Sequence, residues 1–397
     1  GPTQSRMHRL VTELGLETFP VYNDGRLALE LSGRQSLMGA RKDAVPKLGP
    51  LALADLAHGT AAFNRLGASI DLARPWLSQD AAALDGQTFR TWIDRTLHTK
   101  EGRGYFEIFC EAVLAAEPSD VSLLHVLFYA RSGDNLETLL AVDHGAQQDR
   151  IVGGSVLVSE RLAAGLAGSV RLGDAVASIR QDESGVVVGT RSGREFAAEQ
   201  VIVALPPTLA GRLNYEPILP SWRDQLTQRV PAGSVFKLHL VYERPFWRDA
   251  GLSGQSASSD GPVSSTFDNT PPGYARGVML GLVEGAHARA WAHYTAPERR
   301  QAFVDQLVRT FGAQAERPLE YLEKDWMAEE FSRGCYGAHF APGVWTAYGP
   351  ALTEPIGRIH WAGTECSPIW TGYMEGAVRS GEECARSLLA GAGSVTS

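Results

Sequence analysis

The spacing of hydrophobic and polar residues divides the chain into a helical first part and a mixed second part. Residues 1–20 place apolar side chains on one face of a helix that ends at Gly15. The same period continues to about residue 140. The segments that carry it are 50–70, 89–97, 104–118 and 121–132. We therefore expect this first part to be built from helices.

Beyond residue 150 the pattern alternates between strand and helix. Residues 151–168 predict a glycine pair that opens an amphipathic helix, and residues 175–207 predict strands with a turn at Ser192-Gly193. The Ser-, Gly- and Asp-rich residues 251–277 are expected to form a loop or short hairpins. Further strands are expected at 233–247 and 277–285, and a helix at 296–312. This mixture predicts an α/β or α+β fold in two interleaved domains.

Lys237 lies within one of these strands. In the stretch GSVFKLHLVY, alternation puts Lys237 and His239 on one face. A lysine in this pattern is typical of a solvated edge strand, and the pattern alone favours that interpretation. The alternative is a lysine that faces a cavity, where desolvation would shift its pKa.

The last third of the chain ends in a helix and is rich in aromatic residues. Apolar residues recur at helical spacing and predict one buried stripe, formed by Met374, Ala377, Val378, Gly381, Ala385, Leu388 and Leu389. The N–H groups at the start of this helix would suit an anion or a polarised carbonyl. The aromatic residues ordinarily indicate core packing, but two tyrosines across a cavity would favour an amine. They are Trp326, Tyr336, Trp361, Trp370 and Tyr373.

Composition narrows the classes of function. The 397 residues carry a net charge of −8 and no Lys/Arg-rich run, so no nucleic-acid partner is expected. The four cysteines lie far apart, without a CxxC pair or a His at metal spacing. This argues against disulfides and a metal site, and for a reducing compartment. No apolar run nears the roughly 20 residues of a membrane span and no signal peptide is visible, so we expect a cytoplasmic protein without a membrane anchor.

The sequence contains no GxGxxG unit, the fingerprint of a nucleotide-binding βαβ segment of about 30 residues. These motifs alone indicate only a two-domain protein, with an enzyme that acts in a cavity as one possible function.

Several stretches taken together, in their order and approximate spacing, resemble the flavin-containing monoamine oxidase family. They are GPTQSRMHRLVTELGLET, AEPSDVSLL, AQQDRIVGGS, VSERL, VIVALPPTL, GSVFK with VYERPFW, RGCYGAHFAPG, and GRIHWAGTE with WTGYMEGAVRSGE. The resemblance covers essentially the whole chain. In relatives GPTQ follows the GxGxxG unit, so the resemblance implies a chain that is truncated at its N-terminus.

The resemblance also implies a fold. We expect an α/β protein with a glutathione-reductase-type FAD-binding domain, its N-terminal βαβ unit missing, interleaved with an α+β substrate domain. The FAD-binding domain would comprise residues 1–18, 152–226 and 329–397. The substrate-binding domain would comprise residues 19–151 and 227–328.

The residues of a site follow from the same resemblance. Lys237 matches the family's lysine beside flavin N5, and Tyr336 and Tyr373 match its aromatic cage, so these three are the expected catalytic residues. Gln147 and Leu124 match the substrate pocket. The expected flavin-binding residues are Cys335, Val176, Trp326, Gly363, Thr364, Glu365 and Met374. No metal is expected.

Cys335 matches the cysteine that animal members bond to the flavin 8α-methyl group. Here Arg333 replaces the second glycine of the family's GGCY. A covalent FAD and a non-covalent FAD beside a free thiol therefore both stay open.

The implied function is that of an FAD-dependent amine oxidase. A primary or secondary amine would give a hydride to FAD, the imine would hydrolyse to an aldehyde, and O2 would become hydrogen peroxide. The partners would be a small-molecule amine and O2, and a homodimer stays open.

Two alternatives keep the fold and change the substrate. An amino-acid oxidase needs an arginine fork for the carboxylate, and the sequence alone places no arginine in the pocket. A polyamine or putrescine oxidase needs acids for the distal ammonium, and Asp143 is a candidate. A catalytically silent fragment that acts as a binding partner is a third alternative.

Overall fold

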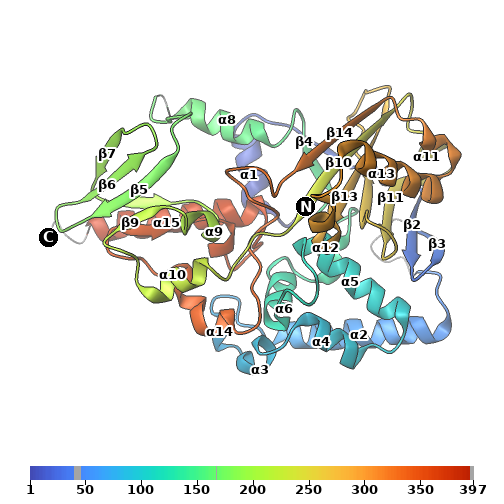
Figure 1. The fold of residues 1–397 in the computed structure, drawn as a ribbon, viewed down its shortest axis with the longest axis horizontal. Helices are drawn as coiled ribbons and strands as arrows, with labels where there is room; N and C mark the ends of the chain where they lie inside the picture. Colours follow the sequence, from blue (N-terminus) through green and yellow to red (C-terminus); the bar gives the residue numbers. More distant parts are fainter. Residues whose placement is uncertain (40–45, 167, 394–397) are drawn as a thin grey trace.

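The structure, a computed structural model, describes residues 1–39, 46–166 and 168–393 (Figure 1). It has the mixture of helices and strands that the sequence predicts. In Figure 1 the two larger sheets stand at opposite ends of the molecule, and a layer of helices runs along one side.

The larger sheet has seven strands, and β10 lies inside it. The order is β14 (Glu320–Asp325), β10 (Val235–Tyr242), β13 (Gly277–Glu284), β12 (Ser265–Asp268), β11 (Leu252–Ser258), β2 (Arg26–Leu31) and β3 (Arg34–Gly39). β10 pairs antiparallel with both β14 and β13. The helix α13 (Ala296–Phe311) packs against this sheet through Phe303 and Leu307, which share a buried core with Phe236 of β10. The short helices α11 (Phe246–Asp249) and α12 (Gly285–Trp291) contribute to the same core.

The hairpin β2–β3 corrects the prediction that this part of the chain is helical. Leu27, Leu29 and Leu31 alternate with other residues at the strand period of two. Ser32 and Gly33 form the turn with φ values of 50° and 77°. The residues 251–277, expected as a loop or short hairpins, contain the antiparallel pair β11–β12.

The helical layer runs along one side of the molecule (Figure 1). Its helices are α2 (Pro50–Ala68), α3 (Ala81–Asp85), α4 (Phe89–Thr96), α5 (Lys100–Leu114), α6 (Leu123–Ser132) and α7 (Leu136–Leu140). The side chains of Thr88, Thr99 and Ser122 accept N–H groups from the first turns of α4, α5 and α6. Buried aromatic rings, among them Phe63 and Phe106, fill the core between these helices.

The second end of the molecule holds the smaller sheets. A four-stranded sheet has the order β7 (Glu195–Ala198), β6 (Val186–Thr190), β5 (Val176–Gln181) and β9 (Asn214–Glu216), with the expected turn at Ser192-Gly193 between β6 and β7. β15 (Ile359–Trp361) pairs parallel with β8 (Val201–Val203). Outside this end, β1 (Thr18–Pro20) pairs antiparallel with β4 (Asp149–Ile151), and β4 lies near β14 and β10 of the large sheet in Figure 1. The helices at the second end are α8 (Val156–Gly165), α9 (Pro207–Ala210), α10 (Ser221–Thr227) and α14 (Val344–Tyr348).

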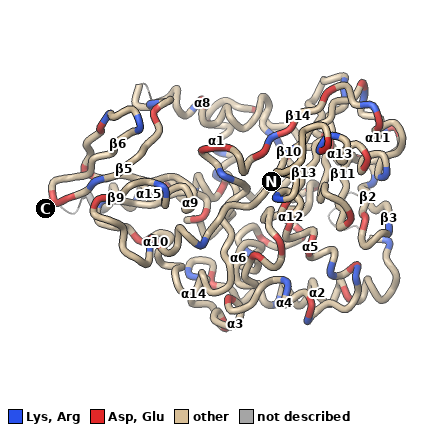
Figure 2. Tube along the Cα trace, viewed as in Figure 1, with Lys and Arg blue, Asp and Glu red and all other residues tan. Residues whose placement is uncertain are grey.

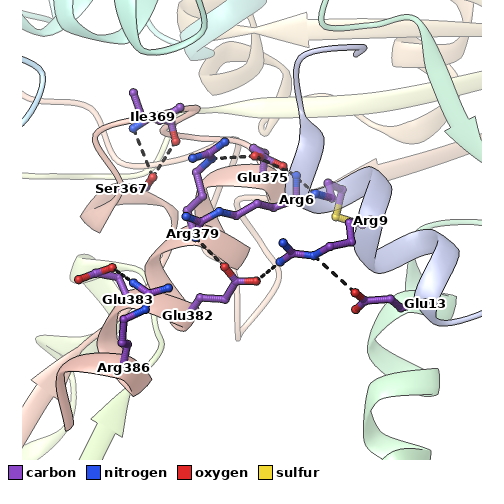
Figure 3. Close-up of polar contacts among 11 residues, drawn as sticks. Arg6, Arg9, Glu13, Ser367, Ile369, Glu375, Arg379, Glu382, Glu383 and Arg386 are labelled. Carbon is purple, nitrogen blue, oxygen red and sulfur yellow. Dashed lines mark hydrogen bonds and ion pairs between the residues drawn. The ribbon is translucent and has the colours of Figure 1, made fainter. Parts of the chain in front are cut away.

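The first and last helices, α1 (Ser5–Glu13) and α15 (Met374–Gly393), are joined by a buried hydrogen bond and by partly exposed ion pairs (Figure 3). The fully buried carboxylate of Glu375 accepts the N–H of Met7 at 2.7 Å and the Nε–H of Arg379 at 2.7 Å. Glu382 accepts from Arg6 and Arg9 at 2.6 and 2.5 Å. A carboxylate at the start of α1 also interacts favourably with the positive end of that helix.

The predicted buried stripe of α15 is wrong. Met374 and Leu389 are 51% and 76% exposed, whereas Glu375 and Ser380 are buried. The helix packs through its polar and small residues because Glu375 bonds α1, and because Gly376 lets the Trp370 carbonyl come so close that a Cβ would lie 2.3 Å from its oxygen. Hydrophobic spacing alone could not report these polar contacts.

Charged residues of both signs are interspersed along the elements in the view of Figure 2. Among the residues that the structure describes, no helix combines the length and the apolar character that a bilayer span requires.

Candidate active site

A cavity of about 470 Å³ lies where the seven-stranded sheet, the helical layer and the start of α15 meet. The sheet contributes Val235 and Lys237 of β10, together with side chains of β12 and β13. The segments that follow β14 and precede α15 contribute aromatic side chains. The predicted site residues that line this cavity are Gln147, Lys237, Trp326, Cys335, Tyr336, Tyr373 and Met374.

Lys237 faces this cavity, so its interpretation as an edge lysine is wrong. β10 lies between β14 and β13 and has no solvated edge. Burial lowers the pKa of Lys237, the neighbouring charge of Arg150 lowers it further, and Cys335 acts in the opposite direction. No acid among the described residues forms an ion pair with Lys237. Its ammonium is therefore a desolvated cation that can respond to negative charge in the cavity.

Tyr336 is held by a buried carboxyl group behind it. Its hydroxyl donates to Glu284 Oε1 at 2.7 Å, and the Ser264 hydroxyl donates to the other oxygen of Glu284. Glu284 is 1% exposed, and burial raises its pKa to about 7 although both hydrogen bonds act to lower it. Tyr336 is 38% exposed as a whole residue and lines the cavity. The hydrogen bond to Glu284 thus holds its hydroxyl in place beside the cavity.

Tyr373 lines the cavity from the residue before α15. Its ring packs edge-on against Trp370 at 5.0 Å and tilted against Tyr129 at 6.2 Å, measured between ring centroids. Its carbonyl accepts the Thr364 hydroxyl at 2.8 Å. Gly372, with φ 79°, makes this arrangement possible, since a Cβ there would lie 2.1 Å from the Tyr129 hydroxyl oxygen.

Cys335 is positioned by a close backbone approach. Its N–H donates to the carbonyl of Gly233 at 3.0 Å, and a Cβ on Gly233 would lie 2.3 Å from the Cys335 carbonyl oxygen. Burial raises the pKa of the Cys335 thiol to about 12, with Glu284 adding to the effect and Lys237 opposing it. A thiol in this state is a weak nucleophile.

A second cavity of about 220 Å³ adjoins the first and shares Trp326, Cys335 and Tyr336 with it. Glu365 lines this second cavity, and its buried carboxyl accepts the Ala338 N–H at 3.0 Å. Burial raises the pKa of Glu365. Gly363 precedes it with φ 139°, a conformation that favours glycine.

Five predicted site residues do not line the larger cavity: Glu365 lines the second cavity, Gly363 and Thr364 come just before it in the chain, and Leu124 and Val176 lie in other elements. Leu124 was expected in the wall, but it is fully buried in the helical core, and Ala112 and Val113 of α5 line the cavity instead. Leu124 and Tyr129 differ by about 140° of rotation around α6, so only one of them can face the cavity. Val176 lies on β5 and is 37% exposed, and its role at a cofactor stays a prediction.

The structure also reveals residues that the sequence interpretation missed. Arg150 and Tyr129 line the cavity, and Glu284 supports it from behind. A charged residue at the end of the apolar stretch GVMLGLVE was a signal for Glu284. The only feature of the sequence that could have suggested Arg150 as a cavity residue is its position three residues after Gln147.

The cavity fits the ring portion of a flavin. Flat aromatic side chains line it together with the exposed apolar side chain of Met374, and Lys237 supplies a cation that no described acid neutralises. Trp326, Tyr336, Tyr373 and Met374 would hold the ring system by contact. A flavin accepts a hydride, and this set of residues suits such a group better than it suits a metal ion.

Comparison with known proteins decides the family. Residues 1–389 match the family described as flavin containing amine oxidoreductase. The chain belongs to this family. The chain is 38% identical over 397 residues to an L-amino acid dehydrogenase of Synechocystis sp., covering 98% of this chain and 83% of that protein. It is 36% identical over 382 residues to a probable flavin-containing monoamine oxidase A of Dictyostelium discoideum, covering 96% and 83%.

A solved structure agrees with these sequence relatives. The cyclohexylamine oxidase of Brevibacterium oxydans superposes on this chain with a TM-score of 0.92 and 33% identity, over 98% of this chain and 85% of that chain. The predicted family and fold class are thereby confirmed. The protein is a flavin-dependent amine oxidoreductase, and its cofactor is FAD.

Proposed function

We propose that the protein oxidises an amine at its α-carbon and passes the electrons to dioxygen. The amine loses a hydride from the α-carbon and a proton from nitrogen, and water hydrolyses the resulting imine to a carbonyl compound and ammonia. Bound FAD supplies the hydride acceptor, and O2 takes up the two electrons and two protons as hydrogen peroxide. For a primary amine that carries two hydrogens on this carbon, the product is an aldehyde.

The observation that carries this proposal is the placement of Lys237, Tyr336 and Tyr373 around one cavity. The two tyrosine rings would hold an uncharged amine with its nitrogen lone pair aligned, since a near-attack geometry lowers the barrier to C–H cleavage. Lys237 would stabilise the negative charge that develops when oxygen accepts an electron. Gln147, which also lines the cavity, would orient the substrate.

The roles proposed for the remaining residues concern the cofactor. Trp326, Met374 and Cys335 would contact the flavin ring, and Gly363, Thr364 and Glu365 would shape the turn beside it. Val176 would lie toward the adenine end. Support for this comes from the cavities that these segments share, and FAD retention by alanine variants would test it.

We also propose the domain division 1–18, 152–226 and 329–397 against 19–151 and 227–328. It is supported by the sheets, because every strand of the seven-stranded sheet falls within the second set. A cytoplasmic location and a homodimer are further proposals, the first resting on the wide spacing of the four cysteines.

The test separates the two halves of the reaction. The FAD-loaded protein is mixed with an amine without oxygen, and the flavin absorbance near 450 nm is expected to bleach. Oxygen is then admitted, and peroxide is measured with a coupled peroxidase. Lys237→Met is expected to slow only the second step, by about 100-fold.

Lys324→Met is the matched control for this test. It removes the same charge from the neighbouring position of β14, where the lysine is 46% exposed and paired with Glu329. Its rates should equal those of the parent protein. A protein that holds no FAD, or whose flavin no amine bleaches, would refute the proposal and favour the silent-fragment alternative.

A further inference from the structure

Arg150 lies in the wall of the active-site cavity without a partner. It is the middle residue of β4, and its side chain is half-buried. Among the described residues, no hydrogen bond or ion pair engages this side chain. Its guanidinium donors are therefore available to a ligand in the cavity.

Arg150 lines the cavity from β4, on the side where Lys237 of the large sheet lies. The two basic groups are close enough for the charge of Arg150 to lower the pKa of Lys237. Asp149 lines the same cavity, and its Oδ2 accepts from Gln148 Nε2 at 3.0 Å and lies 3.8 Å from His8 Nε2 of α1. Ile151 packs against the core between α1 and α8.

The charges near Arg150 leave its guanidinium free. Lys237 and His239 are the basic groups near it, and burial lowers the pKa of His239 to about 4, so this histidine is neutral. Asp268 is the acid whose charge acts on Arg150. Its two oxygens are already engaged by Trp247 at 2.8 Å, Arg248 at 2.7 Å and the Thr270 N–H at 2.9 Å. Asp149, the acid that lines the cavity, forms no ion pair with Arg150 among the described residues and accepts from Gln148 instead.

We infer that Arg150 binds a carboxylate of the substrate, so that the substrate class is an α-amino acid. This inference rests on the proposed function and specifies its substrate. A guanidinium binds a carboxylate through two parallel hydrogen bonds.

The reaction balances in the same way as for a simple amine. The amino acid loses a hydride from its α-carbon and a proton from nitrogen, and the 2-imino acid is hydrolysed to a 2-oxo acid and ammonia. The two electrons leave through the bound flavin. The carboxylate takes no part in bond changes, so its only role is to hold the α-carbon in place.

The test compares substrates that differ only in the carboxylate. The FAD-loaded protein is given phenylalanine, as each enantiomer, against 2-phenylethylamine, and leucine against 3-methylbutylamine. Anaerobic flavin bleaching gives kcat/KM for each. The parent protein should prefer one amino acid of each pair by at least about 10-fold. Arg150→Met should lower this preference by about 10- to 100-fold, the range for one charge-assisted contact, and Arg150→Lys should lose less.

Binding provides a measurement that does not depend on turnover. 3-Phenylpropanoate carries the carboxylate and no amine, and calorimetry should show that Arg150→Met weakens its binding at least about 10-fold. Arg248→Met is the matched control, because it removes a cation from the same acid, Asp268, and should leave the ratio of amino acid to amine unchanged.

The outcomes separate this inference from the function on which it rests. Amines that bleach the flavin beside inert amino acids would overturn the role of Arg150 and keep the amine oxidase. Equal losses on both substrates in Arg150→Met would also overturn it. If neither class bleaches the flavin, the proposed function fails as well. Should Arg150→Met not fold, the preference of the parent protein and Arg150→Lys decide the question.

Discussion

Replacing Glu284 by Gln should remove a pH-dependent loss of stability from the fold. Glu284 is 1% exposed, and burial raises its pKa from the ordinary 4.5 to about 7. Each pH unit of difference corresponds to about 1.4 kcal/mol. Ionising this carboxyl group in the folded protein therefore costs about 3 kcal/mol more than ionising it in the unfolded chain.

The sign of the effect follows from proton binding. Between pH 4.5 and about 7, the folded protein holds a proton on Glu284 that the unfolded chain has released. Folding stability must then fall as pH rises through this window and level off above it. Glutamine has nearly the same shape, offers an oxygen to the Tyr336 hydroxyl, and carries no proton to lose.

The assay is urea unfolding of the FAD-loaded parent and Glu284→Gln proteins at pH 5 and pH 8. The difference in free energy of unfolding, variant minus parent, should rise by about 3 kcal/mol between these values, because groups that do not interact with Glu284 cancel in the comparison. Burial together with the charges of Glu117 and Glu284 raises the pKa of Glu111 to about 8, so Glu284→Gln should also lower that pKa. A difference that stays constant, or that falls with pH, would refute the reasoning.

Glu284→Ala is the control for the hydrogen bonds. It removes the charge as well, but it leaves the hydroxyls of Tyr336 and Ser264 without their acceptor. It should be less stable than Glu284→Gln at both pH values by about 2 kcal/mol. Its kcat should fall more than that of the Gln variant, since the Tyr336 ring loses its support.

Three further predictions concern the cofactor, the cage and the joined helices. The raised pKa of Cys335 leaves only about one thiol in ten thousand ionised at pH 8, so we expect FAD to be bound non-covalently and acid precipitation to release the yellow colour to the supernatant. Colour that stays in the pellet of the parent protein but not of Cys335→Ala would show a covalent flavin. Gly372→Ala brings a Cβ within 2.1 Å of the Tyr129 hydroxyl oxygen. We expect it to lower the free energy of unfolding by about 2 kcal/mol and to lower kcat. An unchanged melting temperature would contradict this prediction. Glu375→Gln breaks the buried pair with Arg379 and the contact with α1 and should cost about 3 kcal/mol in chemical denaturation, against no effect for the exposed Glu383→Gln.

The sequence alone predicted the local structure where the hydrophobic period was regular. The strand β10, the helix α13 and the turn at Ser192-Gly193 appear at their predicted places, because side-chain alternation and turn chemistry are local properties. The order of eight short stretches, taken as a resemblance, predicted the family and the cofactor. It also placed Lys237, Tyr336, Tyr373 and Cys335, which the structure brings around one cavity.

Only the tertiary structure decided which side of each element is buried. It showed that Lys237 faces a cavity inside a sheet, that α15 packs through Glu375 and Gly376 instead of its apolar stripe, and that Leu124 belongs to the helical core. Arg150 and Glu284 were invisible to periodicity for the same reason. Glu284 matters because its hydrogen-bond partners are distant in the sequence, and Arg150 matters because no described residue pairs with it. A sequence pattern describes only the neighbours that a residue has within its own helix or strand.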